Sequence, residues 1–279
     1  MKSHLSTQIE SMLREDMGSG DVTTAFTPNR RVKARIIADA GGIVCGLEEL
    51  KAVFARRRIR VKSSFRDGDR VRKGQDVMSL SGMSRDILPL ERTALNLLSR
   101  MSAVATLTNQ YATRLRALNS KAKIVATRKT TPLLRTFEKK AVVVGGGLPH
   151  RMGLYDMILL KDNHLMLFAG DVAAAVKALR RAKGGLKVEV EVESVKDALV
   201  AAECGADLIM FDNMKPAEIR KAVSLLTERG LRRKVLLEVS GGVSLDNIGR
   251  VGVLEVDWIS SGKLTTAAPW LDFSLHVSL

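Results

Sequence analysis

The feature that most constrains the fold is a rhythm of short apolar runs between about Lys123 and Gly262. Most of these runs lead into a stretch with helical spacing, which predicts alternating strands and helices and therefore a parallel sheet. The runs carry or end in residues suited to anion or metal chemistry: Arg128-Lys129, Lys161, Glu191, Asp212, Ser240-Gly241-Gly242 and Gly262. Reactive residues at the carboxyl ends of many strands are typical of a (β/α) barrel enzyme with its site on that face.

Length and composition allow either two domains or one elaborated barrel. The chain has 279 residues, of which 46% are hydrophobic, so it is long enough for a full core. No apolar run approaches the roughly 20 residues of a membrane helix, and no apolar segment follows the charged amino terminus. Cys45 and Cys204 lie far apart without metal-ligand spacing. We therefore expect buried thiols, a cytoplasmic protein and no membrane partner.

The formal net charge of +15 raises the question of nucleic-acid binding. Aromatic residues make up only 4% of the sequence, so platforms for base stacking are scarce. The densest basic run, residues 56–60, has no interleaved glycine or aromatic residue. It predicts a solvated or subunit-facing surface, and we expect no nucleic-acid partner.

The front of the chain lacks the barrel rhythm and predicts a separate α+β domain. Residues 6–14 have the pattern of an amphipathic helix, and residues 32–38 alternate like a half-buried strand. A long helical stretch covers residues 90–118, and we place the boundary inside it. Residues 271–277 are expected to return as a strand to the front domain. The predicted domains are 1–103 joined by 268–279, and 104–267.

Two segments offer groups that bind anions. Thr127-Arg128-Lys129-Thr130-Thr131-Pro132 supplies two cations and three hydroxyls after a strand, with Pro132 suited to the first turn of a helix. The alternative for this segment is a solvated loop. The second segment has three consecutive glycines, 145–147, which predict unusual dihedral angles or a close backbone approach. His150 and Arg151 follow them and add a proton donor and a bidentate anion clamp.

Two carboxylates are expected on the same face of the barrel. Glu191 and Asp212 lie at or near the ends of successive strands, where they can hold Mg²⁺ together with substrate phosphates. Acid and base catalysis is the alternative role. Glu189 and Glu193 share the alternating side of Glu191, and the strand pattern does not choose among the three.

Two glycine-rich loops follow the last strands. Ser240-Gly241-Gly242 precedes a predicted helix, and Ser260-Ser261-Gly262 follows the next strand. Free backbone N–H groups at such positions commonly bind phosphate. With the cations and carboxylates, they suit a heavily anionic phosphorylated substrate. No nucleophile paired with a base and no dinucleotide-binding GxGxxG are recognisable.

At these residues the chain closely resembles the quinolinate phosphoribosyltransferase family, also called nicotinate-nucleotide pyrophosphorylase (carboxylating). The matching stretches span nearly the whole chain in the family's order. They are residues 15–24, 91–96, 127–132, 145–147, 150–154, 161–164, 188–193, 212–214, 240–242 and 268–269. The resemblance implies an N-terminal α/β sandwich and the open α/β barrel of type II phosphoribosyltransferases, assembled as a dimer or hexamer.

The resemblance also implies the reaction. Quinolinate and phosphoribosyl pyrophosphate would give nicotinate mononucleotide, pyrophosphate and CO₂, in NAD biosynthesis. Arg128, His150 and Arg151 would hold the quinolinate carboxylates. Arg92 would reach into the site of the partner subunit.

The family's pattern assigns the remaining site residues. Lys129 and Lys161 would contact the sugar phosphate or pyrophosphate. Glu191 and Asp212 would bind Mg²⁺ and ribose hydroxyls, so the pattern selects Glu191 among the three glutamates. Lys129, Lys161, Glu191 and Asp212 are thus the expected catalytic residues. The expected phosphate cradle is Ser240, Gly241, Gly242 and Gly262.

Some positions depart from the family's pattern. Leu133 stands where the family usually has glycine, and Pro149 replaces a frequent asparagine. Lys263 and Thr266 lie in its Gly-Ala-Leu-Thr-His segment. A homologous branch associated with molybdate transport, acting on a different anionic substrate, is the alternative function, although it typically lacks the lysine matching Lys161. A further alternative is a non-catalytic basic binding protein. The presence of Lys161, Glu191 and Asp212 at strand ends argues against it, because binding alone does not require them.

Overall fold

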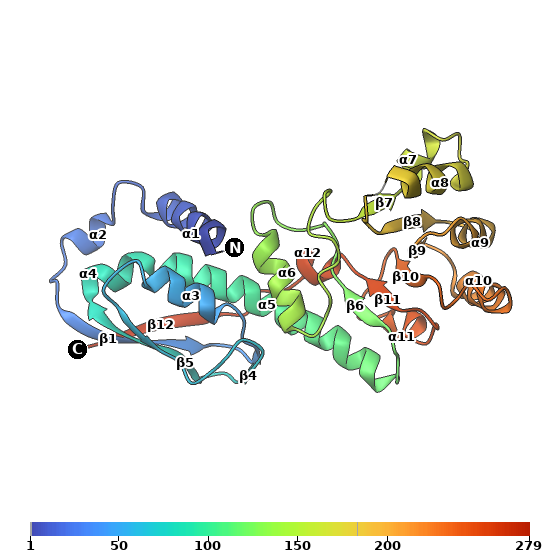
Figure 1. Cartoon of the computed structure of the whole chain (residues 1–279). Coiled ribbons are helices and arrows are strands. Elements are labelled where there is room, and N and C mark those ends of the chain that lie inside the picture. Colours follow the sequence, from blue (N-terminus) through green and yellow to red (C-terminus); the bar gives the residue numbers. More distant parts are fainter. Residues whose placement is uncertain (1, 183) are drawn as a thin grey trace. The chain divides into compact units, whose positions relative to one another are not determined.

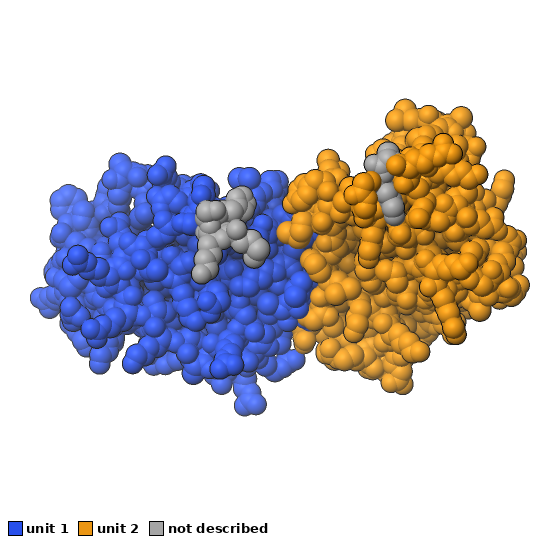
Figure 2. Space-filling model, viewed as in Figure 1, with its two compact units in different colours: residues 1–107, 131–145, 268–279 blue, residues 108–130, 146–267 orange. Residues whose placement is uncertain are grey.

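The computed structural model describes residues 2–182 and 184–279. It groups them into two compact units, coloured separately in Figure 2. The first unit comprises the chain up to residue 107 together with 131–145 and 268–279, and the second comprises 108–130 and 146–267. Among the described residues, every helix is either too short or too polar to span a bilayer.

The first unit is an α/β sandwich in which helices cover one face of an antiparallel sheet (Figure 1). The sheet has the strand order β12-β1-β5-β3, and β2 pairs with β4 separately. Strand β1 alternates exposed and buried residues, so its apolar side chains pack into the core with those of α1, α3 and α5. The elements of this unit are α1 (Lys2–Met17), α2 (Val22–Ala25), β1 (Arg31–Ala38), β2 (Gly42–Ile43), α3 (Leu47–Phe54), β3 (Arg60–Lys62), β4 (Arg70–Val71), β5 (Asp76–Met83), α4 (Ser84–Ile87), the 3₁₀ helix η1 (Leu88–Leu90), the start of α5 (Glu91–Ala117), α6 (Arg135–Val144) and β12 (Phe273–Ser278).

Strand β12 returns to the first unit, as the sequence predicts, and pairs antiparallel with β1 from Lys33↔Ser278 to Ala38↔Phe273. The long predicted helix is α5, which begins in the first unit and ends in the second. The structure divides the chain at residue 107 rather than 103.

Residues 131–145, which the sequence analysis assigns to the barrel domain, group with the first unit. Two sets of ion pairs explain this. Arg100 on α5 lies 2.6 Å from the fully buried carboxylate of Glu138 on α6. Lys140 on α6 lies 2.8 Å from Glu49 and 3.0 Å from Asp67. Burying a charged side chain of α6 without its oppositely charged partner would cost free energy. The partners Arg100, Glu49 and Asp67 all lie in the first unit, so α6 packs there.

The start of α6 also differs from the sequence prediction. Pro132 lies in a turn three residues before the helix rather than in its first turn. The next residue, Leu133, has a left-handed backbone with φ of 65°. Glycine adopts this conformation without strain, which explains the family's usual glycine at this position.

The second unit is an open barrel built on one parallel sheet, with the strand order β6-β11-β10-β9-β8-β7. Strands β6 and β7 follow one another in the sequence but form opposite edges, so the barrel is open between them. Helices α8, α9 and α10 lie on the outer side of the sheet (Figure 1). Its elements are the end of α5, β6 (Lys123–Val125), β7 (Ile158–Leu160), α7 (Asp162–Met166), α8 (Val172–Ala182), β8 (Val188–Val192), α9 (Val195–Glu203), β9 (Leu208–Asp212), α10 (Pro216–Glu228), β10 (Leu236–Ser240), α11 (Ile248–Val251), β11 (Trp258–Ser260) and α12 (Lys263–Thr266).

The strand register places the polar residues on one side of the sheet. Glu191 pairs with Met210, and Met210 pairs with Glu238. Side chains alternate along each strand, so Glu189, Glu191 and Glu238 share the interior side. Asp212 and Ser240 are a register pair at the carboxyl ends. The topology therefore brings these residues together although they lie far apart in the sequence.

The basic run of residues 56–60 lies at the surface of the first unit. Arg56 pairs with Glu10 at 3.0 Å, and Arg57 and Arg58 are exposed. Cys45 is fully buried, as predicted, and burial raises the pKa of its thiol, whereas Cys204 is only partly buried, contrary to the prediction.

Candidate active site

One cavity in the second unit gathers almost all of the predicted site residues. Its volume is about 710 Å³, within the range of small-molecule sites. It opens among the carboxyl ends of the parallel strands, where a barrel enzyme carries its site. Its predicted members are Arg128, Lys129, His150, Arg151, Lys161, Glu191, Asp212, Ser240, Gly241, Gly242 and Gly262.

The loop after β6 presents Arg128 and Lys129 to this cavity. The backbone N–H of Lys129 donates to the Thr127 hydroxyl at 3.0 Å, and Thr265 donates to the Lys129 carbonyl. A Cβ atom at Gly262 would lie 2.8 Å from Cδ of Lys129. Glycine at position 262 therefore leaves the space in which the Lys129 side chain lies.

Arg151 is largely buried and lies near a second guanidinium. Burial and the charge of nearby Arg128 lower the pKa of Arg151. Its Nη1 donates to the carbonyl of Met157 at 3.4 Å. Two guanidinium groups close together favour a bound anion, because an anion removes their mutual repulsion.

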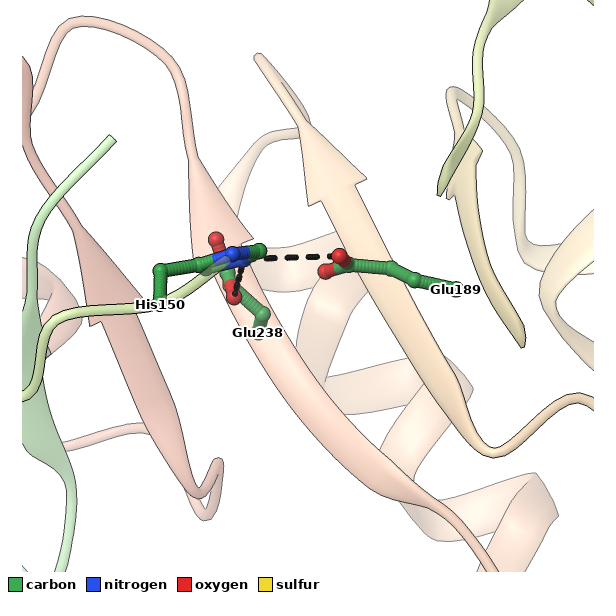
Figure 3. A group of neighbouring side chains, drawn as sticks. All are labelled: His150, Glu189 and Glu238. Carbon is green, nitrogen blue, oxygen red and sulfur yellow. Dashed lines mark ion pairs between the residues drawn. The ribbon is translucent and has the colours of Figure 1, made fainter. Parts of the chain in front are cut away.

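His150 points into a buried acidic pair (Figure 3). Its Nε2 lies 3.2 Å from Glu238 Oε2 and 3.4 Å from Glu189 Oε2, and both glutamates are 0% exposed. Burial alone would lower the pKa of His150, but the hydrogen bonds and charges of the two glutamates raise it to about 9. Burial raises the pKa of Glu189 to about 7 against the lowering effect of His150.

Lys161 and Glu191 form a close ion pair in the cavity. Lys161 Nζ lies 2.6 Å from Glu191 Oε2. The carboxylate of Asp212 accepts a hydrogen bond of 2.8 Å from the Asn213 side chain. Glu191 and Asp212 thus offer oxygen ligands of the kind that Mg²⁺ prefers, whereas Glu193 is exposed beyond the end of β8.

The loop after β10 turns through left-handed backbone, which glycine adopts without strain. Gly241 and Gly242 have φ of 92° and 60°, and Asn213 beside them has φ of 51°. A Cβ atom at Gly241 would lie 2.8 Å from the backbone nitrogen of Asn213. Only glycine therefore lets the β9 and β10 loops approach so closely.

Arg92 lies elsewhere, exposed on α5 in the first unit. Its neighbours Thr93 and Asn96 line a separate cavity of about 580 Å³ within that unit.

Sequence reasoning missed the roles of Glu189 and Glu238 as partners of His150. A signal for Glu238 was present, because it is the one charged residue in the apolar run 235–239. A lone carboxylate inside a buried strand requires a partner.

Two family models match the chain. The N-terminal domain of quinolinate phosphoribosyl transferase matches residues 21–102, and the C-terminal domain matches residues 104–276. The chain belongs to the quinolinate phosphoribosyltransferase family. The match to both domains confirms the resemblance found in the sequence.

Named relatives of the chain agree with this family. A probable nicotinate-nucleotide pyrophosphorylase [carboxylating] of Archaeoglobus fulgidus is 46% identical, covering 94% of this chain and 99% of its own length. The nicotinate-nucleotide pyrophosphorylase [carboxylating] of Homo sapiens is 36% identical, covering 98% and 91%. The solved nicotinate-nucleotide pyrophosphorylase of Francisella tularensis has a TM-score of 0.92 at 33% identity, covering 100% of this chain and 97% of that one. These relatives confirm the predicted sandwich and open barrel and do not favour the molybdate-associated alternative.

Proposed function

We propose that this chain is a quinolinate phosphoribosyltransferase that forms nicotinate mononucleotide, pyrophosphate and CO₂ from quinolinate and phosphoribosyl pyrophosphate in NAD biosynthesis. The observation that carries the proposal is the convergence in one cavity of Arg128, Lys129, Arg151 and Lys161 with two carboxylates. Such a set matches a dicarboxylate together with a phosphorylated sugar.

In this proposal Arg128 and Arg151 bind the two carboxylates of quinolinate directly. Both ring nitrogens of His150 are engaged within the protein, Nδ1 with the Arg151 N–H and Nε2 with the buried glutamates. His150 therefore supports the backbone beside the arginines. Holding both carboxylates aims the pyridine nitrogen at the ribose carbon that it attacks.

Lys129 and Lys161 stabilise the leaving pyrophosphate. As the bond to pyrophosphate breaks, negative charge grows on the leaving oxygen and positive charge grows on the ribose carbon. Placing two ammonium groups beforehand lowers the barrier without reorganising solvent. The new bond makes the ring nitrogen cationic, and that nitrogen stabilises the adjacent carbanion when CO₂ departs.

Glu191 and Asp212 are the proposed Mg²⁺ ligands. The site suits a hard cation because both donors are carboxylates on neighbouring strands that line the same cavity. When bound, the metal would neutralise charge on the pyrophosphate. Lys161, paired with Glu191 at 2.6 Å, holds this carboxylate before a substrate arrives.

Ser240, Gly241, Gly242 and Gly262 form the proposed phosphate cradle. The left-handed glycines at 241 and 242 turn the backbone at the carboxyl end of β10, and successive backbone N–H groups in such turns bind anions. Arg92 is proposed to complete the site of a partner subunit, in a dimer or hexamer in the cytoplasm. Its exposure on α5 supports that role.

A turnover assay with quinolinate, phosphoribosyl pyrophosphate and Mg²⁺ tests the function, with nicotinate as a parallel substrate. We expect nicotinate mononucleotide and CO₂ from quinolinate alone. Arg128→Ala should abolish quinolinate use while the melting temperature stays within about 2 °C, because the residue lies in the cavity rather than in the core. Product from nicotinate alone, or unchanged quinolinate turnover in the variant, would contradict the proposal.

A further inference from the structure

The buried cluster of His150, Glu189 and Glu238 lies beside the open edge of the barrel. Leu148 forms a parallel bridge to Val125 at the end of β6. Its N–H donates to the Ile124 carbonyl, and its carbonyl accepts from the Ala126 N–H, both at 2.9 Å. The chain thus passes along the β6 edge and reaches His150 two residues later.

From this edge the imidazole reaches across the interior to two other strands. Figure 3 shows the His150 ring extending from its loop to Glu238 on β10 and Glu189 on β8. Strand β9 lies between these two strands in the sheet. Trp258 on β11 adds an edge-on contact, with ring centroids 5.7 Å apart and an interplanar angle of 62°. One side chain therefore connects the edge segment to three strands.

The backbone at His150 links this contact to Arg151. His150 has φ of 52°, a left-handed conformation that a residue with a Cβ adopts only when its surroundings hold it there. The N–H of Arg151 donates to His150 Nδ1 at 2.7 Å. The orientation of the ring and the direction of the next residue are therefore coupled.

We propose that Glu189 and Glu238 are positioning residues that act through His150, holding the edge segment so that Arg151 meets a substrate carboxylate. This inference rests on the proposed function. Glu238 also lines the cavity, but both glutamates are 0% exposed and lie within 3.4 Å of His150 Nε2. They fix the imidazole, and the imidazole fixes the backbone from which the Arg151 guanidinium extends into the cavity.

A bound metal is the competing explanation of this cluster. The separations of 3.2 and 3.4 Å between Nε2 and the two oxygens also fit ligands around a tetrahedral transition metal. However, Nδ1 accepts a hydrogen bond, so the ring proton lies on Nε2. A metal ligand would need the lone pair of Nε2, so a ring that carries its proton there favours a direct ion pair with the carboxylates at 3.2 and 3.4 Å.

Glu238→Gln tests the proposal, because it removes the charge and keeps the size. We expect the KM for quinolinate to rise about tenfold while the KM for phosphoribosyl pyrophosphate changes less than twofold. Glu49→Gln is the matched control, since it also removes a buried, ion-paired carboxylate but lies in the first unit. It should lower the melting temperature and leave both KM values unchanged.

A double-mutant cycle with His150→Ala separates positioning from a general structural effect. If Glu238 acts through His150, adding Glu238→Gln to His150→Ala raises the KM for quinolinate no further. Additive effects would overturn the proposal. Glu189→Gln, expected to raise the same KM, replaces Glu238→Gln in the cycle if that variant does not fold.

Two further measurements keep the outcomes distinct. If the proposed function is wrong, the wild-type protein will neither bind nor convert quinolinate. In that case crystal structures of the wild type and Glu238→Gln still test the inference, because an unmoved Arg151 would overturn it. Elemental analysis that finds one transition metal per wild-type chain, absent from Glu238→Gln, would overturn it in favour of a metal site.

Discussion

The close approach of Gly241 to Asn213 predicts the effect of adding one methyl group. In Gly241→Ala the new Cβ lies 2.8 Å from the Asn213 backbone nitrogen and meets its side chain as well. Asn213 donates from its backbone to the Ser240 carbonyl at 3.1 Å and from its side chain to Asp212 at 2.8 Å. Moving Asn213 therefore moves the proposed metal ligand beside it.

Gly230→Ala is the control that separates backbone strain from this clash. Gly230 has φ of 67° with no atom within 4 Å of a Cβ, whereas Gly241 has φ of 92° and is crowded. A left-handed alanine costs roughly 1–2 kcal/mol, part of which is offset by the lower entropy of the unfolded chain. Both variants should therefore lose about 1 kcal/mol of unfolding free energy from strain alone, with a larger loss at position 241.

Urea denaturation and steady-state kinetics distinguish the two contributions. A displacement of about 1 Å at a reacting group can cost about 100-fold in rate. We expect Gly241→Ala to lower kcat/KM for phosphoribosyl pyrophosphate by that order, and Gly230→Ala to leave it within twofold. Equal losses of stability, together with normal kinetics in Gly241→Ala, would refute the argument from the close approach.

Three other substitutions test separate parts of the structure. Asp212→Ala should weaken the Mg²⁺ dependence of turnover, and an unaltered Mg²⁺ titration would contradict its role as a ligand. Glu138→Ala should cost about 3–5 kcal/mol in urea denaturation, because it removes a fully buried carboxylate that lies 2.6 Å from Arg100; a loss below 1 kcal/mol would contradict this. The pKa of Glu189 is raised from 4.5 to about 7, so its carboxyl group keeps its proton to a higher pH in the folded protein than in the unfolded chain. The stability that this proton contributes is complete below pH 4.5 and is lost as the pH rises to about 7. Glu189→Gln should therefore flatten the fall in melting temperature between pH 5 and 7, and an unchanged slope would contradict the raised pKa of Glu189.

The sequence predicts the barrel because its strands have a clear local signature. Apolar runs such as 208–212 end in a polar residue that the register places at the carboxyl edge, so Asp212 and Ser240 could be expected to meet. The same reasoning predicts that residues at other strand ends, such as Lys161 and Gly262, line the cavity. This prediction needs only the alternation of strands and helices. The alternation makes the strands parallel, so their carboxyl ends lie at the same edge of the sheet.

Other features depend on contacts that no local pattern encodes. The grouping of α6 with the first unit follows from the pairing of Glu138 with Arg100, 38 residues earlier. Likewise, the strand pattern identifies Glu189 as an interior residue but does not show that a loop inserts His150 beside it. Long-range ion pairs of this kind arise from tertiary packing.

The pairing of β1 with β12 has a consequence for synthesis of the protein. Strand β1 starts at Arg31, but the strand that covers its edge ends at Ser278. At about 5–20 residues per second, a ribosome needs on the order of 10–50 s to make the intervening chain. During that time the edge of β1 exposes unpaired N–H and C=O groups to other nascent chains. Only when β12 has emerged can this edge close, so β1 completes its pairing long after it is made.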